Sequence, residues 1–302
     1  MEENLTHLFI WGRNCFKSLT PLLGEQAPNS IVVLSSDLEN QELTGFFESK
    51  GIKVSVLYWP EDQAKPADFE RLESTLLALA YDRLVFNASG GGRLPTLQLL
   101  LWCQQSGVDS FVVDKADQQI WLTGETPSLS IEDNANLRLY FKAHQIKTLQ
   151  HGMDMPVTPG LRKLCDDWVL MLNEFGPAYR GLNALASKAR NTGRVLIAPK
   201  GDFHVNADLN VLLKDLSDQG LLTRFQDEVA FTSEPARFFS NGGWLELFVY
   251  SQVQLLKKTM PEIQDIWISA QIEYPQEVRN ELDVVFLANN QLHIVEVKTA
   301  CL

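Results

Sequence analysis

The first half of the sequence predicts an α/β fold in which helices cover both faces of a parallel β-sheet. Two observations support this prediction. Short runs rich in β-branched residues alternate with segments whose apolar residues recur at helical spacing, and the short runs are apolar nearly throughout. Such composition and alternation are typical of parallel sheets buried on both faces. Strands are expected at Thr6–Trp11, Ser30–Ser35, Ile52–Trp59, Arg83–Ser89 and Ser110–Asp114, and helices at Glu39–Lys50, Asp68–Tyr81 and Leu94–Ser106.

A domain boundary is expected near residue 150. A further strand is plausible at Gln118–Thr123, and Gly124–Asn134 is loop-like. The segment His151–Gly160 then carries two prolines and two glycines, a composition typical of linkers. Within it, Thr158 and Pro159 are suited to cap and open the next helix. The sequence therefore predicts a first domain over residues 1–150.

The remainder predicts two smaller domains. Residues 151–240 are expected to form helices at about 159–175 and 178–191, a strand at Val195–Ala198, a helix at Ala207–Gln219 and two short strands within Leu221–Thr232. Helices followed by a small hairpin suggest a winged-helix-like module, which serves for packing about as often as for DNA contact. After a break at Asn241–Gly243, residues 241–302 predict a helix at Trp244–Thr259 and strands at Ile266–Glu273, Glu281–Ala288 and Gln291–Lys298.

Composition narrows the class of protein. The chain has 302 residues, of which 45% are hydrophobic and 21% charged, so it is long enough for several domains and is not intrinsically disordered. Its longest apolar stretches, such as Leu97–Cys103, are far shorter than the roughly 20 residues of a membrane span, and no signal peptide is recognised. We expect a cytoplasmic protein. Its 4 cysteines form no C-x-x-C pair, which argues against a disulfide framework or a zinc knuckle.

The charge is acidic overall but basic in one place. With 26 Lys and Arg against 38 Asp and Glu, the net charge is −12, which argues against a surface that binds nucleic acid all over. Residues 180–200 nevertheless hold five basic side chains and no acidic one: Arg180, Lys188, Arg190, Arg194 and Lys200. This basic segment is either a solvated helix face or a contact for phosphates.

A predicted hairpin near the end of the sequence carries the strongest chemical signal. Asn289 and Asn290 lie between alternating apolar residues, and Asn tolerates the positive φ of a two-residue hairpin turn. With these two residues in the turn, the residue numbers of each cross-strand pair add up to 579. Asp283 then lies opposite Glu296, and Glu281 lies opposite Lys298. All four side chains share one face, because residues two apart and residues directly opposed do so.

Two carboxylates that face each other need a cation between them. Mg²⁺ or Mn²⁺ prefers carboxylate oxygens and activates bound water, so Asp283 and Glu296 are candidate metal ligands. Lys298 could then stabilise the transition state or orient the attacking water. The alternative is an exposed hairpin face on which Glu281 and Lys298 form a surface ion pair of ~0–1 kcal/mol.

The spacing of these residues resembles a known nuclease signature. The pattern is E-x-D, then twelve residues, then E-x-K, as in the PD-(D/E)xK fold of restriction endonucleases, where a preceding helix supplies another acid. Here Glu246 is the only acid in its helix before Glu262, which makes it the candidate further ligand.

A second candidate site lies at the carboxyl ends of the predicted parallel strands, where ligands bind in such sheets. The glycine-rich turn Asn87–Arg93 follows a strand and precedes a helix, so its backbone amides could approach a phosphate. It is neither a Walker A loop nor a G-x-G-x-x-G fingerprint, and a structural tight turn is an equal alternative. Residues singled out at this edge are Gly12, Arg13, Asn14, Ser35, Ser36, Asp37, Asn87, Ser89, Gly90, Gly91, Gly92 and Arg93.

Together these features resemble the CARF-domain nucleases of type III CRISPR systems. The resemblance rests on N-A-S-G-G-G-R, on E-P-A-R-F-F-S-N-G-G-W-L-E, and on V-R-N-E-L-D-V-V with H-I-V-E-V-K-T. It implies a Rossmann-like CARF domain, a winged-helix-like middle and a restriction-endonuclease-like α/β domain. It also implies a homodimer that binds cyclic tetra-adenylate through the strand-end loops and then cleaves DNA, RNA or both in antiviral defence. Asp283, Glu296 and Glu246 would hold Mn²⁺ or Mg²⁺, Lys298 would assist catalysis and Glu281 would support the site.

One departure from that family leaves a second function open. PD-(D/E)xK domains continue beyond the E-x-K strand, whereas this sequence ends four residues after Lys298. The sequence therefore predicts either a fragment or a nuclease domain that lacks part of its core. The alternative function is a cyclic-oligonucleotide sensor or regulator without nuclease activity.

Overall fold

The computed structural model describes residues 4–12, 15–36, 41–79, 81–123, 129–153, 155–191, 196–197, 207–225 and 228–299. Contacts within the chain divide it into two units. The first comprises residues 1–147 together with 274–276 and 287–291, and the second comprises residues 148–273, 277–286 and 292–302. The boundary predicted near residue 150 stays a prediction, and two later segments, 274–276 and 287–291, belong to the first unit. No described helix is both long and apolar enough to span a membrane.

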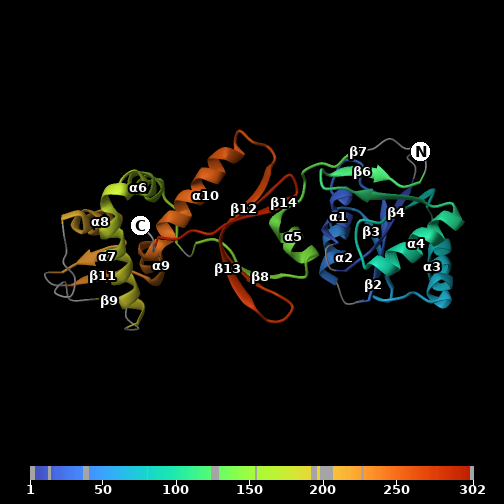
Figure 1. The fold of residues 1–302 in the computed structure, drawn as a ribbon, viewed down its shortest axis with the longest axis horizontal. Helices are drawn as coiled ribbons and strands as arrows, with labels where there is room; N and C mark the ends of the chain where they lie inside the picture. Colours follow the sequence, from blue (N-terminus) through green and yellow to red (C-terminus); the bar gives the residue numbers. More distant parts are fainter. Residues whose placement is uncertain are drawn as a thin grey trace. The chain divides into compact units, whose positions relative to one another are not determined.

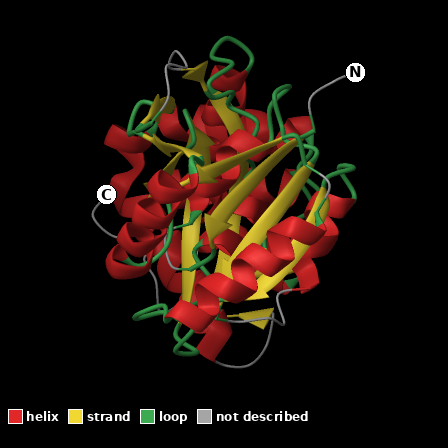
Figure 2. Cartoon of the chain, turned by 90° about the vertical axis from the view of Figure 1, so that its right-hand side faces the viewer, coloured by secondary structure: helices red, strands yellow, loops and turns green. Residues whose placement is uncertain are grey.

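The first unit contains the predicted parallel sheet (Figures 1 and 2). Its seven strands follow the order β3-β2-β1-β4-β5-β6-β7, and the first five in this order are parallel. Their bounds are β1 Leu5–Ile10, β2 Ser30–Ser35, β3 Lys53–Tyr58, β4 Arg83–Asn87 and β5 Asp109–Val113; β6 Gln118–Trp121 and β7 Leu129–Ser130 extend the sheet in antiparallel fashion. The α/β fold class predicted from the sequence is thus confirmed.

Helices bury both faces of this sheet. In β1, Leu8 and Phe9 point to opposite faces, since each belongs to a different buried cluster. Leu8 packs with residues of helices α3 (Pro66–Ala78) and α4 (Arg93–Ser106). Phe9 packs with residues of α1 (Phe16–Leu19), α2 (Gln41–Glu48) and α5 (Leu137–Ala143). Burial on both faces explains why the strands are apolar nearly throughout.

Three short elements of this region differ from the sequence prediction. The segment predicted as a loop at Gly124–Asn134 contains β7, and α5 was not expected. The start of α5 is fixed by Asn136, whose side chain accepts a hydrogen bond from the Leu139 amide at 2.8 Å. The strand β8 (Lys147–Gln150) was also not expected, because it is short and pairs with a strand more than a hundred residues later. Such elements depend on tertiary contacts that local periodicity does not reveal.

The second unit begins with the predicted helices. Helix α6 (Pro159–Leu170) opens as expected, with Pro159 at its start and the Thr158 hydroxyl accepting from the Leu161 amide at 3.1 Å. Helix α7 (Leu172–Asn191) starts earlier than predicted and contains Pro177, which costs it one backbone hydrogen bond. Helix α8 (Ala207–Asp218) and a small sheet of order β10-β11-β9 follow; its strands are Leu222–Arg224, Val229–Phe231 and Leu196–Ile197.

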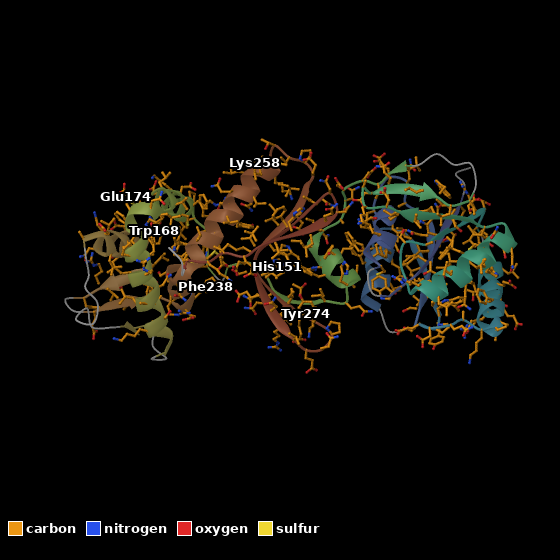
Figure 3. The ribbon with its side chains drawn as sticks, in the orientation of Figure 1. His151, Trp168, Glu174, Phe238, Lys258 and Tyr274 are labelled. Carbon is orange, nitrogen blue, oxygen red and sulfur yellow. The ribbon has the colours of Figure 1, made fainter. Side chains whose placement is uncertain are left out.

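A four-stranded sheet of order β14-β13-β12-β8 carries the predicted hairpin. Its later strands are β12 Ile263–Glu273, β13 Arg279–Ala288 and β14 Gln291–Val295, and the helices before it are α9 Glu234–Phe238 and α10 Trp244–Lys257. One buried cluster joins Trp168 (Figure 3) and Tyr179 of the helical segment with Trp244, Ile268 and Val284. The regions predicted as domains 151–240 and 241–302 therefore share a core, and their separation stays a prediction.

The register of the β13–β14 hairpin is the predicted one. Asn289 and Asn290 have φ values of 48° and 53°, as a two-residue turn of mirror-image type requires. The rings of Phe286 and His293 stack at 4.8 Å with an interplanar angle of 10°, which places these two residues opposite each other. Their numbers sum to 579, so Asp283 and Glu296 are paired positions on the other face.

The turn of this hairpin is anchored through Asn290. Its buried side-chain amide donates to Asp117 at 3.4 Å and to Asp133 at 3.1 Å, and Asp117 also forms an ion pair with Lys17. All four residues belong to the first unit. A carboxylate in place of the Asn290 amide would therefore face two other carboxylates, those of Asp117 and Asp133.

We expect Asn290→Asp to destabilise the first unit by about 2–4 kcal/mol, because it replaces a donor by a buried charge of the wrong sign. Hydrogen exchange of the β13 amides and thermal unfolding would measure the effect. Asn289→Asp is the matched control, since Asn289 is exposed in the same turn. Equal effects of the two substitutions would contradict this account of the turn.

Candidate nuclease site and ligand-binding edge

Helix α10 positions Glu246 in its first turn, directly after a break in the chain. Gly242 has a φ of 113°, and a Cβ atom on Gly243 would lie 2.8 Å from the Phe238 ring. Only glycine fits these two positions, so the Asn241–Gly243 break predicted from the sequence has a steric cause. The adjacent Trp244 is fully buried against Tyr179, with ring centroids 5.1 Å apart. The amino end of α10 is therefore held firmly.

Ser269 orients the Glu246 carboxylate. Its hydroxyl donates to Oε2 of Glu246 at 3.0 Å, and both residues are buried. Ser269 has a positive φ of 49° within β12, an unusual conformation for a residue other than glycine. Ser269 was not predicted from the sequence, because a single serine in a strand carries no signal. The unusual backbone aims its hydroxyl at the candidate site.

Asp283 has a structural partner on the neighbouring strand. The backbone amide of Val297 donates to Oδ2 of Asp283 at 2.6 Å. This hydrogen bond explains why β14 ends at Val295 and does not continue to Lys298 as predicted, because the Val297 amide bonds a side chain. Glu296 and Lys298 lie just beyond the strand and are exposed. No ion pair links Lys298 to Glu281 among the described contacts, so the surface-pair alternative gains no support.

The carboxylates of Glu246, Glu281, Asp283 and Glu296 influence one another. Burial, and then the charge of Asp283, raises the pKa of Glu246 to about 7; Glu281 and Glu296 add to this, and the Ser269 hydrogen bond opposes it. Burial and the Asp283 charge also raise the pKa of Glu281. We call these four residues the carboxylate cluster. Their mutual repulsion is the condition that a divalent cation would relieve.

The carboxylate cluster consists of oxygen donors, the ligand type that Mg²⁺ and Mn²⁺ prefer. However, the described residues include no group of three or more His, Cys, Asp or Glu side chains close enough together to hold an ion. The predicted ligands Glu246, Asp283 and Glu296 are thus near one another without forming a ready-made cage. The donor set fits a divalent metal, and side-chain rotation would be needed to complete it.

A cleft of about 360 Å³ reaches the carboxylate cluster from within the second unit. It contains Glu281 and Ser269, and its wall combines apolar side chains with amides. The guanidinium of Arg237 in this wall donates to both carboxylate oxygens of Glu234, at 2.7 and 2.5 Å. The other lining residues are Gln150, Gly152, Met153, Met155, Pro235, Phe238 and Gln271. The cluster is therefore accessible to a ligand at Glu281.

The glycine-rich turn packs tightly against β1. Gly91 has a φ of 87°, and a Cβ atom on it would lie 2.7 Å from Cβ of Ile10. A Cβ atom on Gly90 would lie 2.5 Å from the Ser18 hydroxyl oxygen. The tight-turn alternative is thus correct as a description of packing. It does not exclude ligand binding. The same packing brings the end of β1 close to this turn, since a Cβ atom on Gly12 would lie 3.9 Å from Cα of Gly91.

Two predicted ligand contacts have internal partners. Asn87 is fully buried; its amide nitrogen donates to the Ser18 carbonyl at 3.3 Å, and its oxygen accepts from the Ser89 amide at 3.0 Å. The Ser89 hydroxyl accepts from the Val113 amide at 2.7 Å. These side chains shape the turn, and the sequence pattern could not separate that role from ligand contact.

The remaining predicted residues at this edge differ in exposure. Ser35 is buried at the end of β2, and the Ser36 hydroxyl donates to Glu61 at 2.8 Å. Gly92 caps α4 without a side chain, and Arg93 is exposed at the first position of that helix. Among the described residues of this group, Arg93 is the exposed cation that could meet a phosphate. Arg13, Asn14 and Asp37 lie outside the described residues.

The basic segment is only partly described. Arg180 and Lys188 lie on α7, and both make polar or electrostatic contacts. The side chains of Arg190, Arg194 and Lys200 lie outside the described part of the chain. Its predicted role as a phosphate contact stays a prediction.

Comparison with known proteins finds one family model and several similar solved structures. Residues 233–302 match the family model described as Card1-like, endonuclease domain. The chain is similar over 97% of its length to protein VC1899 from Vibrio cholerae, with 26% identity, a TM-score of 0.77 and 79% of that chain covered. It is also similar to Can2 from Sulfobacillus thermosulfidooxidans, solved in complex with cyclic tetra-adenylate, with 22% identity, a TM-score of 0.71, and coverage of 97% and 79%. No curated protein matches the chain.

Proposed function

We propose that this protein is a metal-dependent endonuclease that cyclic tetra-adenylate activates in type III CRISPR defence. The observation that carries the proposal is the carboxylate cluster, which lies inside the segment that matches a Card1-like endonuclease domain. The paired register of Asp283 and Glu296 supports it, because the E-x-D and E-x-K motifs meet on one face of the hairpin. The substrate is DNA, RNA or both.

The residues have distinct roles in cleavage. Asp283, Glu296 and Glu246 would hold Mg²⁺ or Mn²⁺, which would supply a water of lowered pKa and neutralise charge on the phosphate. Ser269 keeps the Glu246 carboxylate oriented through its hydrogen bond. Lys298 donates to the phosphate oxygens or to the attacking water, which stabilises the negative charge that develops there. Glu281 supports the site through its charge.

The activator would bind at the edge formed by Gly12, Ser36 and the glycine-rich turn. The exposed amino end of α4 presents backbone amides and Arg93, which together favour a phosphate. A protein with the same fold, Can2, was solved with cyclic tetra-adenylate, and this supports the choice of ligand. A ring with two-fold symmetry suits a homodimer in which each copy presents the same loops. The predicted contacts Arg13, Asn14 and Asp37 belong to this proposal.

A second function follows from one specific observation. The described acidic side chains are not gathered closely enough to hold an ion. This favours a sensor or regulator that binds a cyclic oligonucleotide and cleaves nothing. Metal binding at the carboxylate cluster distinguishes the two functions.

The decisive experiment is cleavage of supercoiled plasmid and of labelled single-stranded DNA and RNA. Each substrate is incubated with Mg²⁺, Mn²⁺ or EDTA, in the presence and absence of cyclic tetra-adenylate. The proposal expects cleavage only where metal and ligand are both present, and loss of that cleavage in Glu296→Ala. Ligand binding without cleavage of any substrate would favour the regulator.

A further inference from the structure

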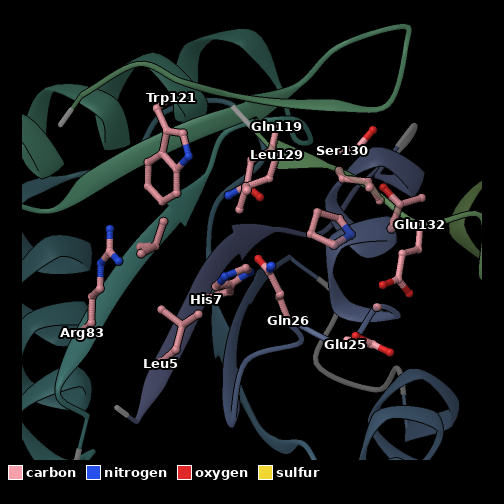
Figure 4. A pocket seen from close by; sticks show the side chains of 15 residues that line it. Leu5, His7, Glu25, Gln26, Arg83, Gln119, Trp121, Leu129, Ser130 and Glu132 are labelled. Carbon is pink, nitrogen blue, oxygen red and sulfur yellow. The ribbon is translucent and has the colours of Figure 1, made fainter. Parts of the chain in front are cut away.

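A second cavity lies in the first unit, at the end of the sheet where the parallel strands begin. Figure 4 shows the side chains that line it. Leu5 and Arg83, the first residues of β1 and β4, line it, whereas the glycine-rich turn follows the end of β4. Its volume is about 210 Å³. This is smaller than the roughly 300–1,000 Å³ of sites for drug-sized ligands, so it suits a smaller molecule.

Two polar atoms of side chains that line this cavity are buried without a partner. They are Nδ1 of His7 and Nε1 of Trp121. His7 is 4% exposed, and its ring contacts Phe111 edge-on at 5.5 Å. Buried polar groups nearly always have hydrogen-bond partners, so two unpartnered ones at a single cavity call for an explanation. Both atoms have almost no exposed surface, so a ligand in the cavity would bond them after a small rotation of each ring.

The charges around the cavity disfavour an anion. Its ionisable lining residues other than His7 are Arg83, Glu25 and Glu132. The Arg83 guanidinium pairs with Asp109 at 3.1 Å and lies 5.4 Å from the Trp121 ring centroid, so its charge is already balanced. Burial, and then the Arg83 charge, lowers the pKa of His7 to about 4, which leaves the imidazole neutral at pH 7. A phosphate would meet two carboxylates and no free cation in this lining.

The rest of the lining is mainly apolar. Leu5, Val85, Leu129 and Ile131 form apolar walls, and Trp121 adds an aromatic one. Apolar walls with a few placed polar atoms are typical of sites for small organic ligands. The indole N–H of Trp121 can only donate, so the ligand needs an acceptor. The neutral His7 ring can donate or accept at Nδ1 according to its tautomer.

We propose that this cavity binds a neutral nitrogen heterocycle of nucleobase or nucleoside size, which accepts a hydrogen bond from Trp121 Nε1 and forms another with His7 Nδ1. This cavity is separate from the site proposed for cyclic tetra-adenylate, which lies at the carboxyl ends of the parallel strands. It requires neither the nuclease activity nor the metal. Adenosine and adenosine 5′-monophosphate are suitable probes, since they differ by the phosphate that the lining disfavours.

The test is titration of the ¹⁵N-labelled full chain with adenosine, followed through the indole N–H resonances. Trp121→Phe assigns the Trp121 resonance and keeps an aromatic ring in place. Trp102→Phe is the matched control, because Trp102 lies in the same unit and its Nε1 already donates to Glu73 at 2.9 Å. A His7→Phe variant removes the second polar atom and keeps a ring against Phe111.

We expect adenosine to shift the Trp121 resonance, and the monophosphate to bind at least about tenfold more weakly, since a tenfold change corresponds to only 1.4 kcal/mol. Trp121→Phe and His7→Phe should each weaken adenosine binding by about tenfold, whereas Trp102→Phe should not change it. Binding should persist when cyclic tetra-adenylate is saturating. No shift of the Trp121 resonance, equal binding of the monophosphate, or displacement by cyclic tetra-adenylate would overturn the proposal; the first outcome would leave ordered water as the partner.

Discussion

Asp283→Asn is expected to lower the rate of nucleic-acid cleavage by about 10²–10³-fold, the range for loss of one electrostatic group from an active site. The asparagine oxygen can still accept the hydrogen bond from the Val297 amide, so the end of β14 should keep its place. Only the negative charge is removed. The result would therefore report on charge at the carboxylate cluster and not on hairpin folding.

A matched control for this variant is Glu277→Gln. Glu277 is an exposed acid in the turn between β12 and β13, and it belongs to the same unit. It should leave the cleavage rate unchanged. If Asp283→Asn retained full activity, or if Glu277→Gln lost as much, the hairpin would not be the catalytic element.

The metal-free stability of Asp283→Asn should change in the opposite direction to its activity. The pKa of Glu246 is raised to about 7, so between its ordinary value and pH 7 the folded protein holds more protons at this residue than the unfolded chain. Stability therefore falls as the pH rises through this interval. Because the Asp283 charge contributes to that shift, the variant should lose less stability over the same interval. Thermal unfolding in EDTA at several pH values would measure this.

The hairpin shows how far a sequence can specify a site. Asn289 and Asn290 fix the turn, and the turn fixes the register, so the pairing of Asp283 with Glu296 could be predicted from spacing alone. The spacing also predicts that the carboxylates share one face of the hairpin. Phe286 and His293 stack on the other face. Local rules suffice here because a two-residue turn leaves no freedom in the register.

Other parts of the site depend on contacts between segments far apart in the sequence. Ser269 bonds Glu246 across 23 positions, and only the tertiary fold brings them together. The Asn87 side chain was predicted to face a ligand, yet it supports the turn from inside by bonding Ser18, 69 positions earlier. A glycine-rich pattern states that the backbone turns tightly. It does not state which side chains point outward.

Arg93→Ala is expected to weaken cyclic tetra-adenylate binding by about 10–100-fold in each copy of the chain, since a charge-assisted hydrogen bond contributes roughly 1.5–3 kcal/mol. Arg93 is exposed at the first position of α4, where the helix dipole already favours an anion. In the proposed homodimer the cyclic tetra-adenylate would lose two such contacts at once, one from each copy of the chain. The combined loss would then approach the product of the two single effects.

Calorimetry of the full chain with the ligand measures this loss, and Lys53→Ala is the control. Lys53 is an exposed cation at the start of β3, at the end of the sheet where the parallel strands begin. Its removal changes the net charge by the same amount as removal of Arg93. If both variants bound with wild-type affinity, Arg93 would not contact the ligand. If both variants weakened binding to the same extent, the effect would be one of long-range charge, and 0.5 M salt would remove it in both. A direct contact at the amino end of α4 would instead make Arg93→Ala bind more weakly than Lys53→Ala at any salt concentration.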